Sequence, residues 1–282
     1  MARHAAGTYR ATAGQSADSA QQPPAVTDSR LPTPRRWYAA RMPLQARLFR
    51  RLRPLFLSIA LPLIQHHRKK NAATRVLGLA LQTAFDVYHP RFFVSSRWLA
   101  EQVRRQPLRD RRFLDMGTGS GLAGLVAAKC GAHVTAVDTQ PLAVQLAREN
   151  ARRQGLADRF DCFVGDLFSA LPRNAQFDII AFDPPLSACR DTSEGSLLAR
   201  FFAHARNHLA ANGRLLLVLS SNLPLRQIDA LLQQQGYRLA QHRQKHHILG
   251  SYHFLELQLD PGRQHRQPFA GTDSPSAAME RI

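Results

Sequence analysis

The stretch RRFLDMGTGSGLAG, residues 111–124, joins a short apolar run, an acid and a glycine-rich loop. The apolar run has the length of a buried strand, and the Ala/Leu-rich residues from Leu122 to Cys130 have the composition of a helix. A strand that passes through a glycine loop into a helix is the opening unit of many α/β domains. The rest of the chain is therefore expected to alternate strands and helices.

The residues after the glycine loop continue this alternation. Further strands are expected at 133–138 (HVTAVD), 160–166 (FDCFVGD), 177–183 (FDIIAFD) and 215–221 (LLLVLSS). Helices are expected at 141–155, around 197–209 and at 229–235. YRLAQHRQ (237–244) and YHFLELQL (252–259) follow each other without a helix, so they should form a hairpin that adds an antiparallel strand to a sheet edge. The order predicts a doubly wound, seven-stranded, Rossmann-like sheet.

The charge of the chain is concentrated near its N-terminus. The formal net charge of the 282 residues is +18, and residues 1–80 hold fourteen Lys or Arg against Asp18 and Asp28, which is +12. Residues 1–34, rich in Ala, Ser, Gln, Thr and Pro, should be a disordered tail. The predicted domains are this tail, a basic and mainly helical extension, a catalytic domain and a disordered C-terminal tail: 1–34, 35–84, 85–260 and 261–282.

The basic extension suggests an anionic partner. It could bind the phosphates of a nucleic acid or an anionic membrane surface, and a merely solvated helical arm is the alternative. Its apolar stretch Pro54–Ile64 is only eleven residues long and is interrupted by Pro62, so no transmembrane segment is expected. The three cysteines are odd in number and widely spaced, which excludes a disulfide framework and fits a reducing cytoplasm: Cys130, Cys162 and Cys189.

An acid stands at the end of each of the first four predicted strands. These acids are Asp115, Asp138, Asp166 and Asp183. One acid at a strand end is usually a turn former or a helix cap. Four in succession, with a glycine loop after the first, indicate a ligand site, because ligands of doubly wound sheets bind beyond the carboxyl ends of the strands.

Two cofactor classes fit the glycine loop. GSGLAG, residues 119–124, satisfies G-x-G-x-x-G, and Asp138 lies where a ribose-binding acid would, so a pyridine-nucleotide oxidoreductase is an alternative. Asp115, however, would place negative charge beside a pyrophosphate. S-adenosylmethionine has no phosphate and carries an ammonium, a sulfonium and a ribose diol, which suit two carboxylates. The glycines would then allow close approach of the backbone.

Four motifs, DMGTGSGLAG, VTAVD, GDLF and DPPL, resemble class I S-adenosylmethionine-dependent methyltransferases, over roughly residues 85–260. DPPL (183–186) and the upstream stretch DVYHPRFFVSSRWLAEQV (86–103) are similar to the "small domain" and HemK-like group, whose signature is (N/D)PP(Y/F). The resemblance implies a methyltransferase sheet and an N-methyltransferase that modifies a planar amide or amino nitrogen. The methyl acceptor would be an RNA or DNA base or a protein glutamine.

The resemblance also implies roles for individual residues. The implied cofactor-binding residues are Asp115, Gly117, Thr118, Gly119, Gly121, Asp138, Asp166 and Leu167. Among these, Asp138 would accept hydrogen bonds from the ribose hydroxyls, and Asp166 with Leu167 would flank the adenine. The implied catalytic residues are Asp183, Pro184, Pro185 and Leu186.

The catalytic motif would act by orienting its substrate. An amide or aromatic amino nitrogen is a poor nucleophile because its lone pair is delocalised. By resemblance, the Asp183 side chain and the Pro184 carbonyl oxygen hold both N–H bonds and aim the lone pair at the methyl group. Leu186 stands where the group has an aromatic residue that stacks on the acceptor. An aromatic could instead come from Tyr88, Phe92 or Phe93.

No metal site is expected from the sequence, and one alternative function stays open. His242, His246 and His247 have no acidic or cysteine partners at ligand spacing, so no metal site is expected. A non-catalytic RNA- or protein-binding module that keeps the fold is the alternative function from another class. The sequence names neither the acceptor nor the atom that is methylated.

Overall fold

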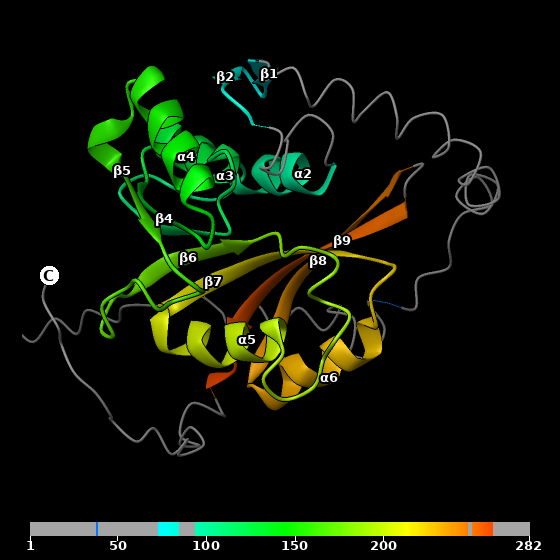
Figure 1. The fold of residues 1–282 in the computed structure, drawn as a ribbon. Helices are drawn as coiled ribbons and strands as arrows, with labels where there is room; N and C mark the ends of the chain where they lie inside the picture. The colour runs from blue at the N-terminus through cyan, green and yellow to red at the C-terminus, as the bar shows by residue number, and fades with distance from the viewer. Residues whose placement is uncertain (1–37, 39–72, 85–93, 248–249, 262–282) are drawn as a thin grey trace, which may run out of the picture. The chain divides into compact units, whose positions relative to one another are not determined.

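The computed structural model of the chain describes Tyr38 and residues 73–84, 94–247 and 250–261. In these residues, seven strands form one sheet in the order β5-β4-β3-β6-β7-β9-β8 (Figure 1). The strands are β3 (Arg112–Met116), β4 (His133–Asp138), β5 (Phe160–Val164), β6 (Phe177–Phe182), β7 (Leu209–Ser220), β8 (Tyr237–His247) and β9 (Gly250–Leu259). The helices are α2 (Val94–Val103), α3 (Leu122–Lys129), α4 (Pro141–Arg153), α5 (Leu197–His208), α6 (Leu225–Gln234) and the short 3-10 turn η2 (Ala157–Arg159). The predicted doubly wound, seven-stranded fold is confirmed.

The antiparallel strand lies one position inside the sheet edge. Strands β3 to β7 pair in parallel, whereas β9 is antiparallel to both β7 and β8. The predicted terminal antiparallel strand is thus confirmed: the last hairpin joins the parallel strands through β9, and β8 is the edge strand. The reason is composition: Phe254 and Leu255 of β9 are fully buried, whereas β8 carries Arg243 and Lys245, and charged residues protect an exposed edge from further pairing.

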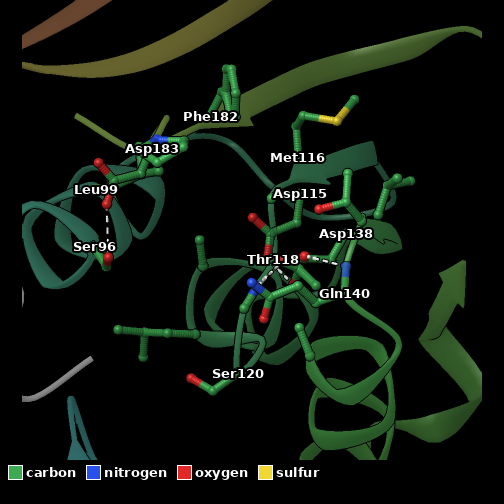
Figure 2. Close-up of a pocket in the computed structure, with 18 of the residues that line it drawn as sticks. Ser96, Leu99, Asp115, Met116, Thr118, Ser120, Asp138, Gln140, Phe182 and Asp183 are labelled. Atoms are coloured by element: carbon green, nitrogen blue, oxygen red, sulfur yellow. Dashed lines mark hydrogen bonds between the residues drawn. The ribbon is translucent and has the colours of Figure 1, made fainter. Parts of the chain in front are cut away.

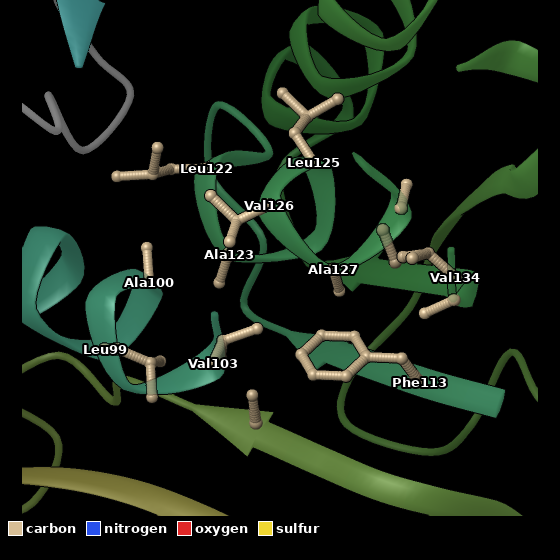
Figure 3. Packing of buried hydrophobic residues seen from close by; sticks show 14 of the residues in the cluster. Leu99, Ala100, Val103, Phe113, Leu122, Ala123, Leu125, Val126, Ala127 and Val134 are labelled. Carbon is tan, nitrogen blue, oxygen red and sulfur yellow. The ribbon is translucent and has the colours of Figure 1, made fainter. Parts of the chain in front are cut away.

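Two helical layers cover the sheet. Helices α2, α3 and α4 pack on one face and α5 and α6 on the other, each over its own cluster of buried apolar residues (Figure 1). Figure 3 shows the first cluster, in which Phe113 of β3 lies beneath the small residues of α3. Gly124 lets α3 lie close to the sheet, since an added Cβ would lie 2.8 Å from the Phe160 ring. This close approach places the start of α3 directly beside the carboxyl end of β3.

The segment before α2 contains a hairpin instead of a helix. Strands β1 (Thr74–Val76) and β2 (Leu79–Leu81) pair in antiparallel fashion around Leu77 and Gly78, whose φ angles are 52° and 80°. Two turn residues with positive φ between strands of alternating burial are typical of a tight hairpin. Residues 73–84, the described end of the expected basic and mainly helical extension 35–84, thus hold this hairpin. Except for Tyr38, the remainder of that extension lies outside the described residues.

Asn150 of α4 connects this hairpin to the glycine loop. Its side chain is fully buried, accepts a hydrogen bond from the Gln82 N–H at 2.7 Å and donates to the Gln82 carbonyl at 3.0 Å. The same amide group donates to the Ser120 carbonyl at 2.9 Å. Asn150 therefore holds the chain after β2 against the loop between β3 and α3.

Several predictions fall on residues that the structure does not describe. They are the tail 1–34, all of the tail 261–282 except Pro261, and the apolar stretch Pro54–Ile64. The division into four domains therefore stays a prediction, as does the cytoplasmic location. Within the described ranges, no helix combines the length and the apolar character needed to cross a bilayer.

Candidate active site

One cavity brings together the four acids that follow successive strands. It has a volume of about 300 Å³, and Asp115, Asp138, Asp166 and Asp183 all line it. Figure 2 labels three of these acids, Asp115, Asp138 and Asp183. In sequence order, the four acids stand at the ends of β3, β4, β5 and β6, respectively. The four strands are neighbours in the sheet, in the order β5-β4-β3-β6, so their carboxyl ends lie along one edge. The cavity thus lies where ligands of doubly wound sheets bind.

Most of the other predicted site residues also line the cavity. Gly117, Thr118, Gly119, Leu167 and Pro185 do so, whereas Gly121, Pro184 and Leu186 are not among the lining residues. Gly121 instead has a packing role, since its φ is 91° and an added Cβ would lie 3.2 Å from Ala147 Cβ. Leu186 packs against the apolar cluster beneath α5 and α6.

Asp115 holds the glycine loop from inside the protein. Its Oδ2 accepts hydrogen bonds from Thr118 Oγ1 at 2.7 Å and from the Gly124 N–H at 2.9 Å, and the residue is only 3% exposed. Burial raises the pKa of Asp115 to about 6, against these two hydrogen bonds, and the nearby Asp138 and Asp183 raise it further. Gly124 was not among the predicted site residues, although it is the third glycine of GSGLAG, which packs the helix against the sheet.

Asp138 connects the two loops that border the cavity. Its Oδ2 accepts a hydrogen bond from the Gly119 N–H at 2.9 Å, and its Oδ1 accepts one from the Gln140 N–H at 3.0 Å. A carboxylate offers about four acceptor positions. Half-buried Asp138 can therefore keep both loop bonds and still accept hydrogen bonds from a ligand hydroxyl.

Asp166 forms an ion pair that the sequence did not indicate. Its Oδ2 lies 2.7 Å from Arg200 Nη1 of α5, and both side chains are about half exposed. The following residue, Leu167, is buried with a φ of 51° and lines the cavity. Arg200 is 34 residues from Asp166 in sequence, so no local pattern could have paired them.

Asp183 lies at the opposite side of the cavity, against the start of α2. Ser96 Oγ of α2 donates a hydrogen bond to Asp183 Oδ2 at 2.7 Å (Figure 2). Burial raises the pKa of Asp183 to about 6, and hydrogen bonds from Ser96 and Ser95 act in the other direction. The preceding Phe182 packs on Phe201, with ring centroids 4.4 Å apart.

Sequence reasoning missed the remaining lining residues. They are Ser96, Leu99, Met116, Ser120, Leu122, Ala123, Val137, Thr139, Gln140, Ala143, Phe182 and Leu197. Most of them flank the predicted acids or glycines by one to three positions, and that adjacency is the signal that could have found them. Ser96, Leu99 and Leu197 come from distant helices and carry no such signal. Tyr88, Phe92 and Phe93, the alternative aromatics, lie outside the described residues.

The histidines of β8 and β9 contact each other and a serine. His242 Nε2 lies 3.0 Å from His253 Nδ1, and His246 Nδ1 lies 2.8 Å from Ser251 Oγ. Burial lowers the pKa of His253 to about 4, and the nearby His242 and His246 lower it further. Among the described parts of the chain, no three His, Cys, Asp or Glu side chains are arranged to hold a metal ion.

The strand order, the glycine loop and the row of acids define the class I methyltransferase fold. A 16S rRNA methyltransferase from T. thermophilus, solved in complex with AdoMet and guanosine, matches with a TM-score of 0.54 and 22% identity over 67% of this chain and 50% of that one. A ribosomal protein L11 methylase from Lactobacillus delbrueckii subsp. bulgaricus matches with a TM-score of 0.50 and 20% identity over 59% of this chain and 78% of that one. At these identities the two structures show the fold alone.

The methyltransferase small domain family matches residues 83–249, which is more than half of the chain. The chain belongs to this family. Among its relatives, a ribosomal protein uL3 glutamine methyltransferase from Bordetella pertussis is 43% identical over 83 residues, 29% of this chain and 28% of that protein. A ribosomal protein L11 methyltransferase from Desulfitobacterium hafniense is 44% identical over 66 residues, 23% of this chain and 21% of that protein. The chain thus matches less than a third of the length of either relative.

Proposed function

We propose that the chain is an S-adenosylmethionine-dependent N-methyltransferase that acts on a planar amide or amino nitrogen. The observation that carries the proposal is the meeting of Asp115, Asp138, Asp166 and Asp183 around one cavity of about 300 Å³ beside the glycine loop. Membership of the methyltransferase small domain family supports it. A structural neighbour that was solved in complex with AdoMet supports the choice of cofactor.

The donors and acceptors of the cavity fit S-adenosylmethionine better than a dinucleotide. The Gly119 N–H, which a pyrophosphate would need, already donates a hydrogen bond to Asp138 Oδ2, and Asp115 lies directly behind the loop. Two carboxylates beside a phosphate would repel it. The same carboxylates suit an ammonium and a ribose diol, so the pyridine-nucleotide oxidoreductase is the weaker alternative.

The residues of the chain would position the acceptor. S-adenosylmethionine, when bound, supplies an electrophilic methyl group on a sulfonium. Asp183 is mainly ionised at neutral pH because its pKa is about 6, so its oxygens can accept an N–H of the acceptor and fix the direction of the nitrogen lone pair. The acceptor nitrogen would bond to the methyl carbon as the carbon–sulfur bond breaks, S-adenosylhomocysteine would leave, and one proton of the nitrogen would pass to solvent.

Replacing Asp138 by alanine is expected to weaken the binding of S-adenosylhomocysteine about tenfold to a hundredfold, because each hydrogen bond to a charged acceptor contributes about 1.5–3 kcal/mol. Calorimetric titration with S-adenosylhomocysteine and with NADH checks this. Asp161→Ala, which removes an exposed acid of β5, is the matched control and should bind normally. Binding of NADH without binding of S-adenosylhomocysteine would exclude the methyltransferase proposal.

Two kinds of methyl acceptor fit the proposal: a nucleic-acid base and a protein glutamine. The names of the uL3 and release factor glutamine methyltransferases from Bordetella pertussis support a glutamine. The high positive charge of residues 1–80 supports a nucleic acid. A salt titration separates the two, because nucleic-acid binding releases counterions.

If the acceptor is RNA, the affinity for a labelled rRNA stem-loop should fall steeply with salt. Replacing Arg50, Arg51 and Arg53 by glutamine in the full chain should flatten the log–log slope by about 0.7–0.9 for each phosphate that these arginines neutralise in the wild type. Charge substitution is preferable to deletion of residues 1–75, because Val76 in β1 is buried and deletion would disrupt the hairpin. A flat salt response would favour the protein acceptor, and binding to anionic vesicles would make the arm a membrane contact.

A further inference from the structure

Ser96 and Asp183 bring together two elements that are far apart in sequence. Ser96 Oγ lies 2.7 Å from Asp183 Oδ2, and both residues line the cavity (Figure 2). We propose that Ser96 is a positioning residue for Asp183: its hydroxyl fixes the orientation of the carboxylate and keeps it an acceptor for the N–H of the methyl acceptor. This inference rests on the proposed function and assigns a specific role to the first turn of α2.

The first turn of α2 is suited to a carboxylate. Ser95 and Ser96 are the second and third residues of this ten-residue helix, which has no acidic residue of its own in the first turn. The N-terminal end of a helix carries unpaired N–H groups and a partial positive charge, so it favours an anion. Asp183, which directly follows β6, brings that negative charge from another element.

Packing keeps the Ser96 hydroxyl in place. Leu99 and Val103 of α2 are buried in the apolar cluster on that face of the sheet, and the Trp98 ring packs edge-on against Phe254 of β9 with centroids 6.3 Å apart. On its outer side, Glu101 forms an ion pair with Lys245 of β8 at 3.3 Å. A hydrogen-bond donor on a helix fixed in this way can hold a functional side chain in one orientation.

The orientation matters because the carboxylate has several acceptor positions. The serine hydroxyls occupy some of the roughly four positions of the carboxylate and leave the others for the N–H of an acceptor. Without Ser96 the carboxylate could rotate about its own bond, and the lone pair of the acceptor nitrogen would lose its fixed direction. Ser96 would thus act through Asp183 and not on the substrate directly.

The hydroxyl also controls the proton of Asp183. Burial raises the pKa of Asp183 to about 6, and the hydrogen bonds from Ser96 and Ser95 counteract that rise. Among the described residues, Asp115 of β3 and Cys189 of the loop after β6 interact electrostatically with Asp183. A protonated Asp183 would present an O–H donor at the place where the N–H group of the methyl acceptor needs a hydrogen-bond acceptor.

Replacing Ser96 by alanine is expected to raise the pKa of Asp183 by about one to two units, since a hydrogen bond to a charged group stabilises the charged form by that amount. Carbon-detected NMR titration of the cofactor-free full-length protein measures this, with the Asp183 signal assigned by its loss in Asp183→Asn. Ser96→Thr keeps the hydroxyl and should restore the original pKa. Ser187→Ala, which removes an exposed hydroxyl four residues after Asp183, should leave it unchanged.

The acidic limb of the pH–rate profile for methyl transfer should move upward by the same amount in Ser96→Ala. An unchanged pKa of Asp183 in a Ser96→Ala protein that melts like the wild type would overturn the inference, and so would a failure of Ser96→Thr to restore it. The titration needs no cofactor. If the protein bound no S-adenosylhomocysteine, the proposed function would fail while the effect of Ser96 on Asp183 could still be read.

Discussion

Replacing Asp183 by alanine is expected to lower the rate of methyl transfer about a hundredfold or more while leaving the affinity for S-adenosylhomocysteine nearly unchanged. The side chain stands at the α2 side of the cavity, where it is bonded to Ser96, and the glycine loop is held by Asp115 and Asp138 instead. Its loss therefore affects the orientation of the acceptor, and misplacing a reacting group by about 1 Å can cost about a hundredfold in rate. Single-turnover transfer of labelled methyl groups, with calorimetry of the cofactor product, measures both quantities.

Asp183→Asn is the matched control for this change. The amide keeps the shape of the side chain and one acceptor oxygen, and asparagine occupies this position in part of the (N/D)PP(Y/F) group that the sequence resembles. We expect its rate to lie between those of wild type and Asp183→Ala. Equal rates for all three proteins on the true acceptor would show that the DPP turn is structural. Absence of transfer to any RNA or protein in wild type would favour the non-catalytic binding module.

The parts of the fold with a local cause could be predicted from the sequence. The strand–loop–helix unit at 111–130 and the four strands that end in acids each follow from a short pattern of apolar residues and glycines. Because parallel strands place their carboxyl ends at one edge, the gathering of the four acids followed from the strand assignment alone. The sequence alone thus predicted the sheet and the four acids of the cavity, but only nine of the 21 residues that line it.

The features that the sequence did not predict depend on contacts between distant residues. The hydrogen bond between Ser96 and Asp183 joins residues that are 87 positions apart, and the one between Asn150 and Gln82 joins residues that are 68 positions apart. The position of β9 inside the sheet depends on which strand of the last hairpin is covered on both faces. The spacing of apolar residues in the two strands does not show which one this is. The hairpin at 74–81 was not predicted, because these residues were assigned to a basic and mainly helical extension.

Asp115→Ala is expected to weaken S-adenosylhomocysteine binding about a hundredfold or more and to destabilise the fold. Unlike Asp138, this residue is buried, and it satisfies both Thr118 Oγ1 and the Gly124 N–H. Each buried donor left without a partner costs about 1–3 kcal/mol, and the loss of a carboxylate also removes attraction for the cofactor's ammonium. Calorimetry and thermal unfolding measure the two effects. Asp115→Asn, which keeps the shape and removes the charge, separates them.

The titration of Asp115 gives a second test, because protonation of this residue should stabilise the fold but weaken the binding of the cofactor. Burial raises its pKa from 3.8 to about 6 in the folded protein, so the folded state binds the proton more tightly than the unfolded state. The stabilisation from this proton is fully present below pH 3.8 and is lost as the pH rises through about 6. Affinity for a cationic ligand should instead increase over the same range, because Asp115 becomes charged. In Asp115→Asn the pH dependence of binding should largely disappear, and the remaining pH dependence of folding should come from Asp183, whose pKa is also raised to about 6. If cofactor affinity in wild type were independent of pH between 4 and 7, Asp115 would not contact the ammonium, and the cavity would bind its ligand through Asp138 and the glycine loop alone.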